Sequence, residues 1–314
     1  MKIKILYDIF RLLRPRQWIK NLAIFATVTF TGQLFEPDTF EKVFLGFLVF
    51  CSLSSAIYVV NDIIDRDKDK KHPFKRFRPI PSGDVSVFLA VIIAFVLTVG
   101  SFIVGSMVTP AFLLLLLVYF ILQILYSMFF KNIAVADIMA IAAGYILRVY
   151  AGEFATGLHI SVWLLLTTIS LSLFLAIGKR RSELTLISKY PPAQIKMVRA
   201  SLSHYSERLL DVYASIFATS TFISYSLFTF LENPAGFKLS LSILMPEFFP
   251  DFFQRKWLMI TIFPVVYGLM RYLQDIYEKH EGESPDKVLL SDKPLLATVC
   301  LWIIMVLVII YVVG

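Results

Sequence analysis

The chain has 314 residues, of which 58% are hydrophobic, 15% are aromatic and only 17% are charged. This composition excludes an ordinary soluble enzyme, because about a quarter of the residues in soluble domains are charged. Several windows of about 20 residues are nearly free of charge, which is the length an α-helix needs to cross a bilayer. A β-barrel is excluded as well, since its strands would alternate apolar and polar residues. The sequence therefore predicts an all-α, polytopic membrane protein with a single domain over residues 1–314.

The formal net charge of +7 raises the question of a nucleic-acid partner. In a membrane protein, however, excess Lys and Arg more often marks cytoplasmic loops and the anionic lipid surface. We therefore expect membrane lipid and no nucleic acid. Cys51 and Cys300 each lie inside an apolar run and predict neither a disulfide framework nor a metal cluster. The oligomeric state stays open between a monomer and a homo-oligomer.

Hydropathy predicts about nine transmembrane helices. They lie near residues 18–35, 41–60, 84–106, 109–130, 134–157, 160–178, 207–231, 256–275 and 294–313. Before the first of them, Ile5, Ile9 and Leu12 recur at helical spacing, which predicts an amphipathic helix in the membrane interface. Most Lys and Arg residues fall on the side of the N-terminus, so the positive-inside rule places that side in the cytoplasm. The long outer connection 232–255 is expected to form a short interfacial helix.

The stretch that follows the second span carries four aspartates in eight residues, including Asp62, Asp65 and Asp69. If the helix continues, Asn61, Asp65 and Asp69 lie at i, i+4 and i+8 and share one face. Carboxylates this close repel one another unless they share a cation, and Mg²⁺ is usually held by one or two carboxylates plus substrate phosphates. We therefore predict a Mg²⁺ site at Asn61, Asp62, Asp65 and Asp69, with the three aspartates as catalytic residues. The alternative is a solvated loop in which neighbouring Lys and Arg neutralise the acids.

A basic loop follows the aspartates. Pro73 and Pro79 stop helix propagation at its two ends, so that the loop presents Lys75, Arg76 and Arg78 beside the carboxylates. Carboxylates for a metal next to cations for phosphate are typical of a diphosphate site. The positive-inside rule explains part of the basicity, but it does not explain the acids.

These residues resemble the first Asp-rich motif, NDxxDxxxD, of the UbiA superfamily of intramembrane prenyltransferases, which Asn61, Asp62, Asp65 and Asp69 match. The resemblance is closer still to one branch, the decaprenyl-phosphate phosphoribosyltransferases. It implies a UbiA-like helical bundle that transfers phosphoribose from 5-phosphoribosyl-1-diphosphate (PRPP) to a polyprenyl phosphate with Mg²⁺ and releases pyrophosphate. The other residues that carry it lie within 14–21, 72–80, 126–131, 144–148, 178–180 and 271–292.

One segment departs from the general superfamily pattern. Ordinary members carry a second Asp-rich motif after the sixth span, whereas this chain has Lys179, Arg180 and Arg181 there. Cations in place of carboxylates suit a ligand whose phosphate is bound directly, and PRPP offers its 5-phosphate in addition to its diphosphate. Lys179 and Arg180 are therefore predicted to bind PRPP. Positive-inside bias is the alternative explanation.

Two charged residues, Asp137 and Arg148, lie inside the fifth span. Such groups cost ~2.5–3.5 kcal/mol at the bilayer centre and are usually functional. Eleven residues apart, they differ by only about 20° around a helix, so both can face one substrate cavity. A polar seam between helices is the alternative. The remaining predicted substrate-binding residues stand at the cytoplasmic ends of the first and fourth spans and are Lys20, Asn21, Tyr126 and Lys131.

Two other functions stay open. A prenyltransferase proper would use a polyprenyl diphosphate donor and an aromatic acceptor, and the missing second Asp cluster argues against it. A polyprenyl-phosphate carrier or flippase would not need a metal motif beside a basic loop. We expect a phosphoribosyltransferase of the cell membrane, with its active site facing the cytoplasm.

Overall fold

The computed structural model describes residues 2–71, 75–187, 200–232, 256–279 and 285–313, and every regular element in these residues is helical. Seven of the described helices are long and apolar enough to cross a membrane. They are α3 (Pro37–Ile64), α6 (Val87–Ser106), α7 (Pro110–Met128), α8 (Ala136–Thr156), α9 (Val162–Ile187), α11 (Glu207–Leu231) and α15 (Lys293–Val308) with its π-helical continuation η7 (Ile309–Val313). The predicted all-α membrane architecture is confirmed.

The other two of the nine predicted spans are each divided into shorter pieces. The first consists of an 11-residue 3₁₀ helix, η1 (Pro15–Phe25), and α2 (Ala26–Phe30). The eighth consists of η5 (Trp257–Thr261) and α13 (Ile262–Gln274), followed by the π-helical η6 (Asp275–Lys279). Hydropathy measures how apolar a segment is and does not register a change in its hydrogen-bond pattern. The count of long spanning helices is therefore seven among the described residues, and not nine.

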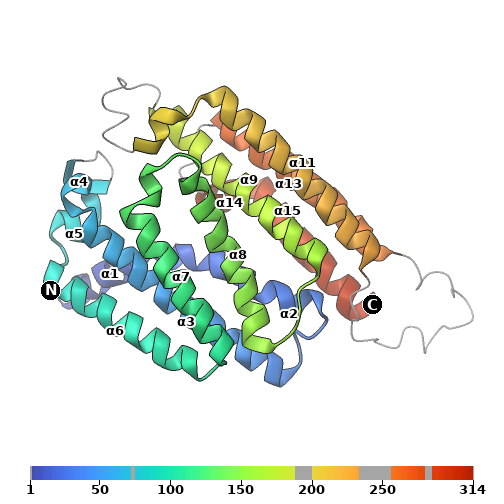
Figure 1. The fold of residues 1–314 in the computed structure, drawn as a ribbon, viewed down its shortest axis with the longest axis horizontal. Coiled ribbons are helices and arrows are strands. Elements are labelled where there is room, and N and C mark those ends of the chain that lie inside the picture. Colours follow the sequence, from blue (N-terminus) through green and yellow to red (C-terminus); the bar gives the residue numbers. More distant parts are fainter. Residues whose placement is uncertain (1, 72–74, 188–199, 233–255, 280–284, 314) are drawn as a thin grey trace, which may run out of the picture.

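α8 lies at the centre of the bundle. It packs against α7, α9 and α3, and also against η1 and α2, while α6 and α11 lie at opposite edges (Figure 1). The spanning window of α3 is 61% buried and that of α6 only 17%, which separates an inner helix from one that faces lipid.

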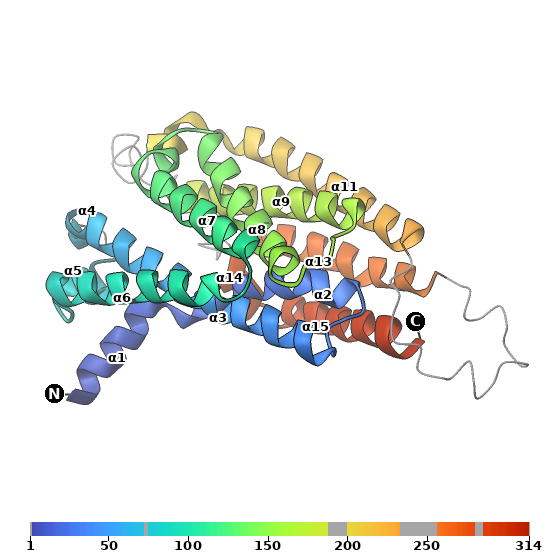
Figure 2. The ribbon, with the colours of Figure 1, turned by 60° about the horizontal axis from the view of Figure 1, so that its bottom comes forward.

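The short elements gather at one end of the bundle, which we call the motif end because Asn61–Asp69 lies there. They include α1 (Lys2–Leu13), α4 (Arg66–Lys71), η2 (Lys75–Phe77) and α5 (Pro79–Ser82), and Figure 2 shows α1 projecting beside α4 and α5. The helix expected at the N-terminus is present, and its Leu6, Tyr7 and Phe10 are exposed. The interfacial helix expected within 232–255 falls on residues outside the described part of the chain.

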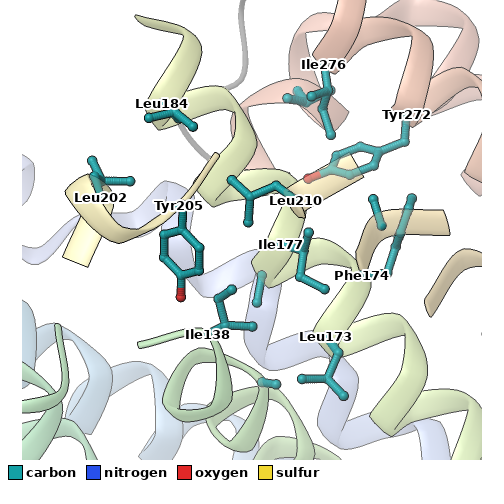
Figure 3. Close-up of a cluster of buried hydrophobic side chains, with 14 of the residues drawn as sticks. Ile138, Leu173, Phe174, Ile177, Leu184, Leu202, Tyr205, Leu210, Tyr272 and Ile276 are labelled. Atoms are coloured by element: carbon teal, nitrogen blue, oxygen red, sulfur yellow. The ribbon is translucent and has the colours of Figure 1, made fainter. Parts of the chain in front are cut away.

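Two apolar clusters hold the spans together. One includes Phe50, Phe112 and Tyr119 and joins α3 to α7. The other includes Phe174, Ile177 and Tyr272 and joins α9 to α13 (Figure 3). The rings of Phe174 and Tyr272 meet edge to face with centroids 5.4 Å apart, a favourable aromatic geometry. Polar groups that lie between these clusters are thereby shielded from lipid.

We expect Gly152→Ala to lower the free energy of unfolding by about 3 kcal/mol. A Cβ at Gly152 of α8 would lie 2.0 Å from the carbonyl oxygen of Ile24, so the substitution would push α8 away from the backbone of η1. Thermal unfolding in detergent micelles measures the effect. Gly100→Ala in α6 is the matched control, because nothing lies within 4 Å of its added Cβ. Equal stability of the two variants would contradict the close contact.

Candidate functional site

The aspartate motif continues the helix of α3 into α4. The amide of Asp65 donates to the carbonyl of Asn61 over 2.9 Å, and the amide of Asp69 donates to the carbonyl of Asp65 over 2.8 Å. The side chains, however, divide into two groups. Asp62 and Asp69, seven residues apart, both contact Arg78, whereas Asp65 contacts Lys131, which lies between α7 and α8. Asn61 is half-buried one turn before Asp65.

Asp62 and Asp69 are both buried against Arg78. Their exposed fractions are only 2% and 4%. Arg78 Nη1 lies 3.1 Å from Asp62 Oδ1 and 2.7 Å from Asp69 Oδ2. Arg78 stands at the start of α5, and its amide bonds back to the carbonyl of the half-buried Lys75 over 3.0 Å. The structure thus places Arg78 of the basic loop against two of the carboxylates, and the diphosphate site itself stays a prediction.

Arg14 is a further cation at this site that the sequence analysis did not select. Its Nη2 lies 2.5 Å from Asp62 Oδ1, and its guanidinium lies 5.0 Å from the ring centroid of Tyr58. Arg14 has a φ of 53°, a left-handed conformation that is uncommon for a residue other than glycine. It turns the chain from α1 into η1. In the sequence, the only indication of a role for Arg14 is that it lies in the segment 14–21, which carries part of the resemblance to the UbiA superfamily.

Lys131 contacts the aspartate motif at Asp65. Its Nζ lies 2.9 Å from both carboxylate oxygens of Asp65. It belongs to η3 (Phe130–Asn132), between α7 and α8. The carbonyl of Lys131 accepts a hydrogen bond of 3.0 Å from Ser201 Oγ in η4 (Ala200–His204). The structure therefore places the predicted Lys131 at the motif and ties it to a segment 70 residues away.

The donor set of the motif suits Mg²⁺ when phosphate is present. Within the described ranges, no three His, Cys, Asp or Glu side chains are grouped closely enough to hold a metal alone. Mg²⁺ does not require such a group, since it takes hard oxygen ligands and is usually held by one or two carboxylates plus substrate phosphates. Asp62 and Asp69 present their carboxylates to the same side of the motif, because both contact Arg78. These oxygens fit the predicted ion.

Asn21 and Arg148 form a buried network of their own. Asn21 Nδ2 donates to Ser54 Oγ over 3.2 Å, and Asn21 Oδ1 accepts from Arg148 Nε over 2.8 Å. Arg148 also donates to the hydroxyl of Tyr119 over 2.7 Å and to the carbonyl of Gly144 over 2.5 Å. No described carboxylate forms an ion pair with Arg148. This charge is therefore held among neutral partners in the middle of α8.

Asp137 belongs to a different network. Arg180 Nε lies 2.6 Å from Asp137 Oδ2, and neither side chain is accessible. Asp137 also accepts hydrogen bonds from Ser201 Oγ over 3.0 Å and from the Tyr205 hydroxyl over 2.7 Å. Asp137 and Arg148 thus have separate hydrogen-bond partners about 16 Å apart along α8, and a cavity shared by the two stays a prediction.

Ser201 and Tyr205 are site-supporting residues that sequence reasoning missed. Burial, and then the hydrogen bond to Asp137, raise the pKa of Tyr205 above its ordinary value, so the phenol stays protonated and acts as a donor. The same hydroxyl accepts a 2.6 Å hydrogen bond from the amide of Val135, whose φ is 66°. Tyr205 thereby supports an unusual backbone conformation at the start of α8. No pattern in the sequence marks either hydroxyl.

The basic segment after the sixth predicted span separates into three different environments. Arg180 is paired with Asp137 and with Glu183, and it donates to the Tyr126 hydroxyl over 3.1 Å. Arg181 Nη2 lies 3.1 Å from Glu207 Oε2, and Arg181 Nε lies 2.8 Å from Asp211 Oδ1. Lys179 is half-buried and forms no ion pair with any described residue. Among these three cations, only Lys179 lacks a carboxylate partner among the described residues.

The comparisons with known proteins identify the family of the chain. The model of the UbiA prenyltransferase family matches residues 22–289. A Mycolicibacterium smegmatis protein named decaprenyl-phosphate phosphoribosyltransferase is 33% identical over 92% of this chain and 88% of its own length. A Corynebacterium glutamicum protein of the same name is 34% identical over 96% of this chain and 86% of its own length.

Solved structures show the same fold. A UbiA homologue from Archaeoglobus fulgidus bound to GPP and Mg²⁺ superposes with a TM-score of 0.69, over 96% of this chain and 99% of that chain. Its sequence identity is 19%, so this likeness concerns the fold alone. With the family match and the relatives above, the chain is a multi-pass membrane protein that belongs to the UbiA prenyltransferase family.

Proposed function

We propose that this protein transfers phosphoribose from PRPP to a polyprenyl phosphate of the decaprenyl type, releases pyrophosphate, and requires Mg²⁺. We place the reaction at the cytoplasmic face of the cell membrane, because most Lys and Arg residues lie on that side of the predicted topology. The relatives named above support the choice of donor, since they align over almost the whole chain.

One observation carries the proposal: cations suited to phosphate lie both at the aspartate motif and near the Tyr58 hydroxyl. Asp62, one helical turn after Tyr58, forms ion pairs with Arg14 and Arg78. The Tyr58 hydroxyl donates to Gln17 Oε1 over 3.3 Å, and the same oxygen accepts a 2.5 Å hydrogen bond from Lys20 Nζ. PRPP has a diphosphate at one end and a monophosphate at the other, whereas a prenyl diphosphate has phosphates at one end only. The two-ended arrangement therefore favours PRPP.

The leaving diphosphate would lie at the motif end. Asp62 and Asp69 as one group, and Asp65 with the side-chain oxygen of Asn61 as the other, would supply oxygens to Mg²⁺ bound together with the diphosphate, and the ion when bound neutralises charge on the departing group. Arg78 and Lys131 are already fixed beside these carboxylates. Cations fixed in advance stabilise developing charge without having to reorganise. Lys75 lies on the same loop as Arg78 and adds to this positive field.

The acceptor needs little chemical activation. A phosphate monoester has a second pKa near 6 and is mostly a dianion at pH 7. Its oxygen attacks C1 of the ribose as the bond from C1 to the diphosphate oxygen breaks, so no strong general base is required. We infer that the protein acts by positioning and electrostatics. The product of an in-line displacement on the α donor is a β-linked lipid phosphoribose.

The test is incubation of the purified protein with labelled PRPP, Mg²⁺ and polyprenyl phosphates of several lengths in detergent. We expect a labelled lipid, release of pyrophosphate, and a pH profile that is flat above ~7 because the acceptor is already ionised. Geranylgeranyl diphosphate with 4-hydroxybenzoate should yield no product. If that pair reacts and PRPP does not, the protein is an aromatic prenyltransferase. If neither reacts but polyprenyl phosphate crosses the bilayer of reconstituted vesicles, it is a carrier.

A further inference from the structure

The peptide group that joins Phe77 to Arg78 is hydrogen-bonded at both of its polar atoms. Its N–H belongs to Arg78 and donates to the carbonyl of Lys75 over 3.0 Å. Its carbonyl belongs to Phe77 and accepts a 3.1 Å hydrogen bond from Arg11 Nη2. A peptide group is planar, and in the trans form its N–H and C=O point in opposite directions. The two hydrogen bonds therefore hold from both sides the plane from which the Arg78 side chain departs.

Arg11 belongs to α1, and its guanidinium is itself held in position. Its Nη1 lies 3.7 Å from Asp8 Oδ1, one helical turn earlier, and its Cζ lies 5.8 Å from the ring centroid of Tyr7. The Asp8 side chain is only 4% exposed, whereas that of Arg11 is 42% exposed. The two terminal nitrogens of Arg11 thus have different partners: one faces a buried carboxylate on α1, and the other holds the backbone of the loop before α5.

α1 contacts the segment around α5 at two further points. Leu12 is completely buried in an apolar cluster with Ile80 and Val85. Lys4 Nζ lies 3.0 Å from Asp84 Oδ1, beyond the other end of α5. A helix of four residues such as α5 is too short to be stable alone, so its position depends on what packs against it. α1 lies beside it (Figure 2) and provides that support.

The position of Arg78 matters because its side chain stands at the aspartate motif. Its Nη1 lies 3.1 Å from Asp62 Oδ1 and 2.7 Å from Asp69 Oδ2. These carboxylates are also the proposed ligands of Mg²⁺, so an anchor of Arg78 that does not depend on them is needed when substrate is bound. The hydrogen bonds to its backbone supply one. A cation that is fixed in advance stabilises developing charge without having to reorganise.

On the basis of the function proposed above, we propose that Arg11 is a positioning residue, which holds the backbone of Arg78 so that the Arg78 guanidinium stands ready at the diphosphate of PRPP. Arg11 itself would not contact the reacting atoms. In this way α1, which lies outside the bundle of spans, takes part in the reaction through the backbone of a loop.

The experiment is a double-mutant cycle between Arg11→Met and Arg78→Met. Methionine cannot donate a hydrogen bond, so Arg11→Met should lower kcat with PRPP about 10-fold, the effect of losing one hydrogen bond from a charged group. The KM for PRPP and the KM for the lipid phosphate should each change less than about threefold. In the Arg78→Met background, Arg11→Met should cause no further loss of kcat, because its effect passes through Arg78. Arg11→Lys keeps a donor and should recover part of the lost kcat.

Lys4→Met is the matched control, because it removes a cation from the same helix whose ion pair with Asp84 lies beyond α5. The Lys4 side chain is 74% exposed, and such a surface pair contributes little to stability, so kcat should stay within about twofold of the wild type. Hydrogen exchange without substrates gives a second measurement: the peptide that contains Arg78 should exchange faster in Arg11→Met than in Lys4→Met. If Arg11→Met does not fold, Arg11→Gln serves in its place, since its shorter side chain would not reach the carbonyl of Phe77.

Four results would overturn the role of Arg11 while leaving the proposed function intact: an unchanged kcat in Arg11→Met, an equal loss of kcat in Lys4→Met, additive effects with Arg78→Met, or unchanged hydrogen exchange around Arg78. A wild-type protein that does not use PRPP would instead overturn the proposed function, and this inference with it.

Discussion

Asp65→Asn and Asp69→Asn are each expected to lower kcat by about 10³-fold while the protein remains folded and inserted. Asparagine keeps the size of the side chain and loses the negative charge. Asp65 binds Lys131 through both oxygens, and the buried Asp69 holds Arg78. Loss of either charge therefore removes a proposed metal ligand and also releases a cation from its position. Initial rates with saturating PRPP and lipid phosphate measure the effect.

Asp67→Asn is the matched control for the motif. Asp67 lies between the two tested residues but is exposed to solvent, and its substitution should leave kcat within about twofold of the wild type. Excess EDTA should stop the wild-type reaction, and added Mg²⁺ should restore it. Normal turnover of both Asp65→Asn and Asp69→Asn, or full activity in EDTA, would remove the metal assignment.

Arg180→Met is expected to destabilise the fold by about 3–5 kcal/mol, because it leaves the carboxylate of Asp137 buried without its ion-pair partner. Neither side chain is accessible to solvent, so water cannot compensate for the loss. Denaturant unfolding in mixed micelles measures the change. The double variant Asp137→Leu with Arg180→Met should recover most of the stability, since it removes both buried charges at once.

Lys179→Ala separates the two functions of the basic segment. It should raise KM for PRPP about 10-fold or more with little change in stability, because Lys179 forms no ion pair with a described residue. The KM for the lipid phosphate should rise less. If Arg180→Met instead left stability unchanged and raised only KM for PRPP, Arg180 would be a ligand of the phosphate and not a structural cation.

The fold could be predicted from sequence wherever a single apolar helix crosses the bundle. The span predicted at 84–106 is α6 (Val87–Ser106), and the one predicted at 207–231 is α11 (Glu207–Leu231). The prediction was less accurate at residues 18–35, where the structure has η1 and α2. A 3₁₀ helix and an α-helix of equal hydropathy differ only in hydrogen bonding, and contacts with α3 and α8 decide between them.

The site was predictable where it is local in sequence. The aspartates and Arg78 lie within 17 residues and could be grouped by spacing alone. Arg148 and Asn21, by contrast, are 127 residues apart, and no pattern in either segment predicts that the two side chains are in contact. The helical-wheel argument gave Asp137 and Arg148 similar directions, but their depth in the bundle differs, and the neighbouring helix at each depth determines the partner.

Arg148 has a consequence for any attempt to stabilise this protein. Arg148 is 5% exposed, and among the described residues its guanidinium is hydrogen-bonded only to neutral groups of Asn21, Gly144 and Tyr119. Replacing Arg148 would leave acceptors on Asn21 and Tyr119 buried without their donor, and an unsatisfied buried polar group costs about 1–3 kcal/mol. The charge of Arg148 gives the interior a positive potential before any substrate arrives, which lowers the electrostatic work of bringing a phosphate in from water. A search for stabilising substitutions should therefore leave Arg148 in place, since its replacement would lower both stability and substrate affinity.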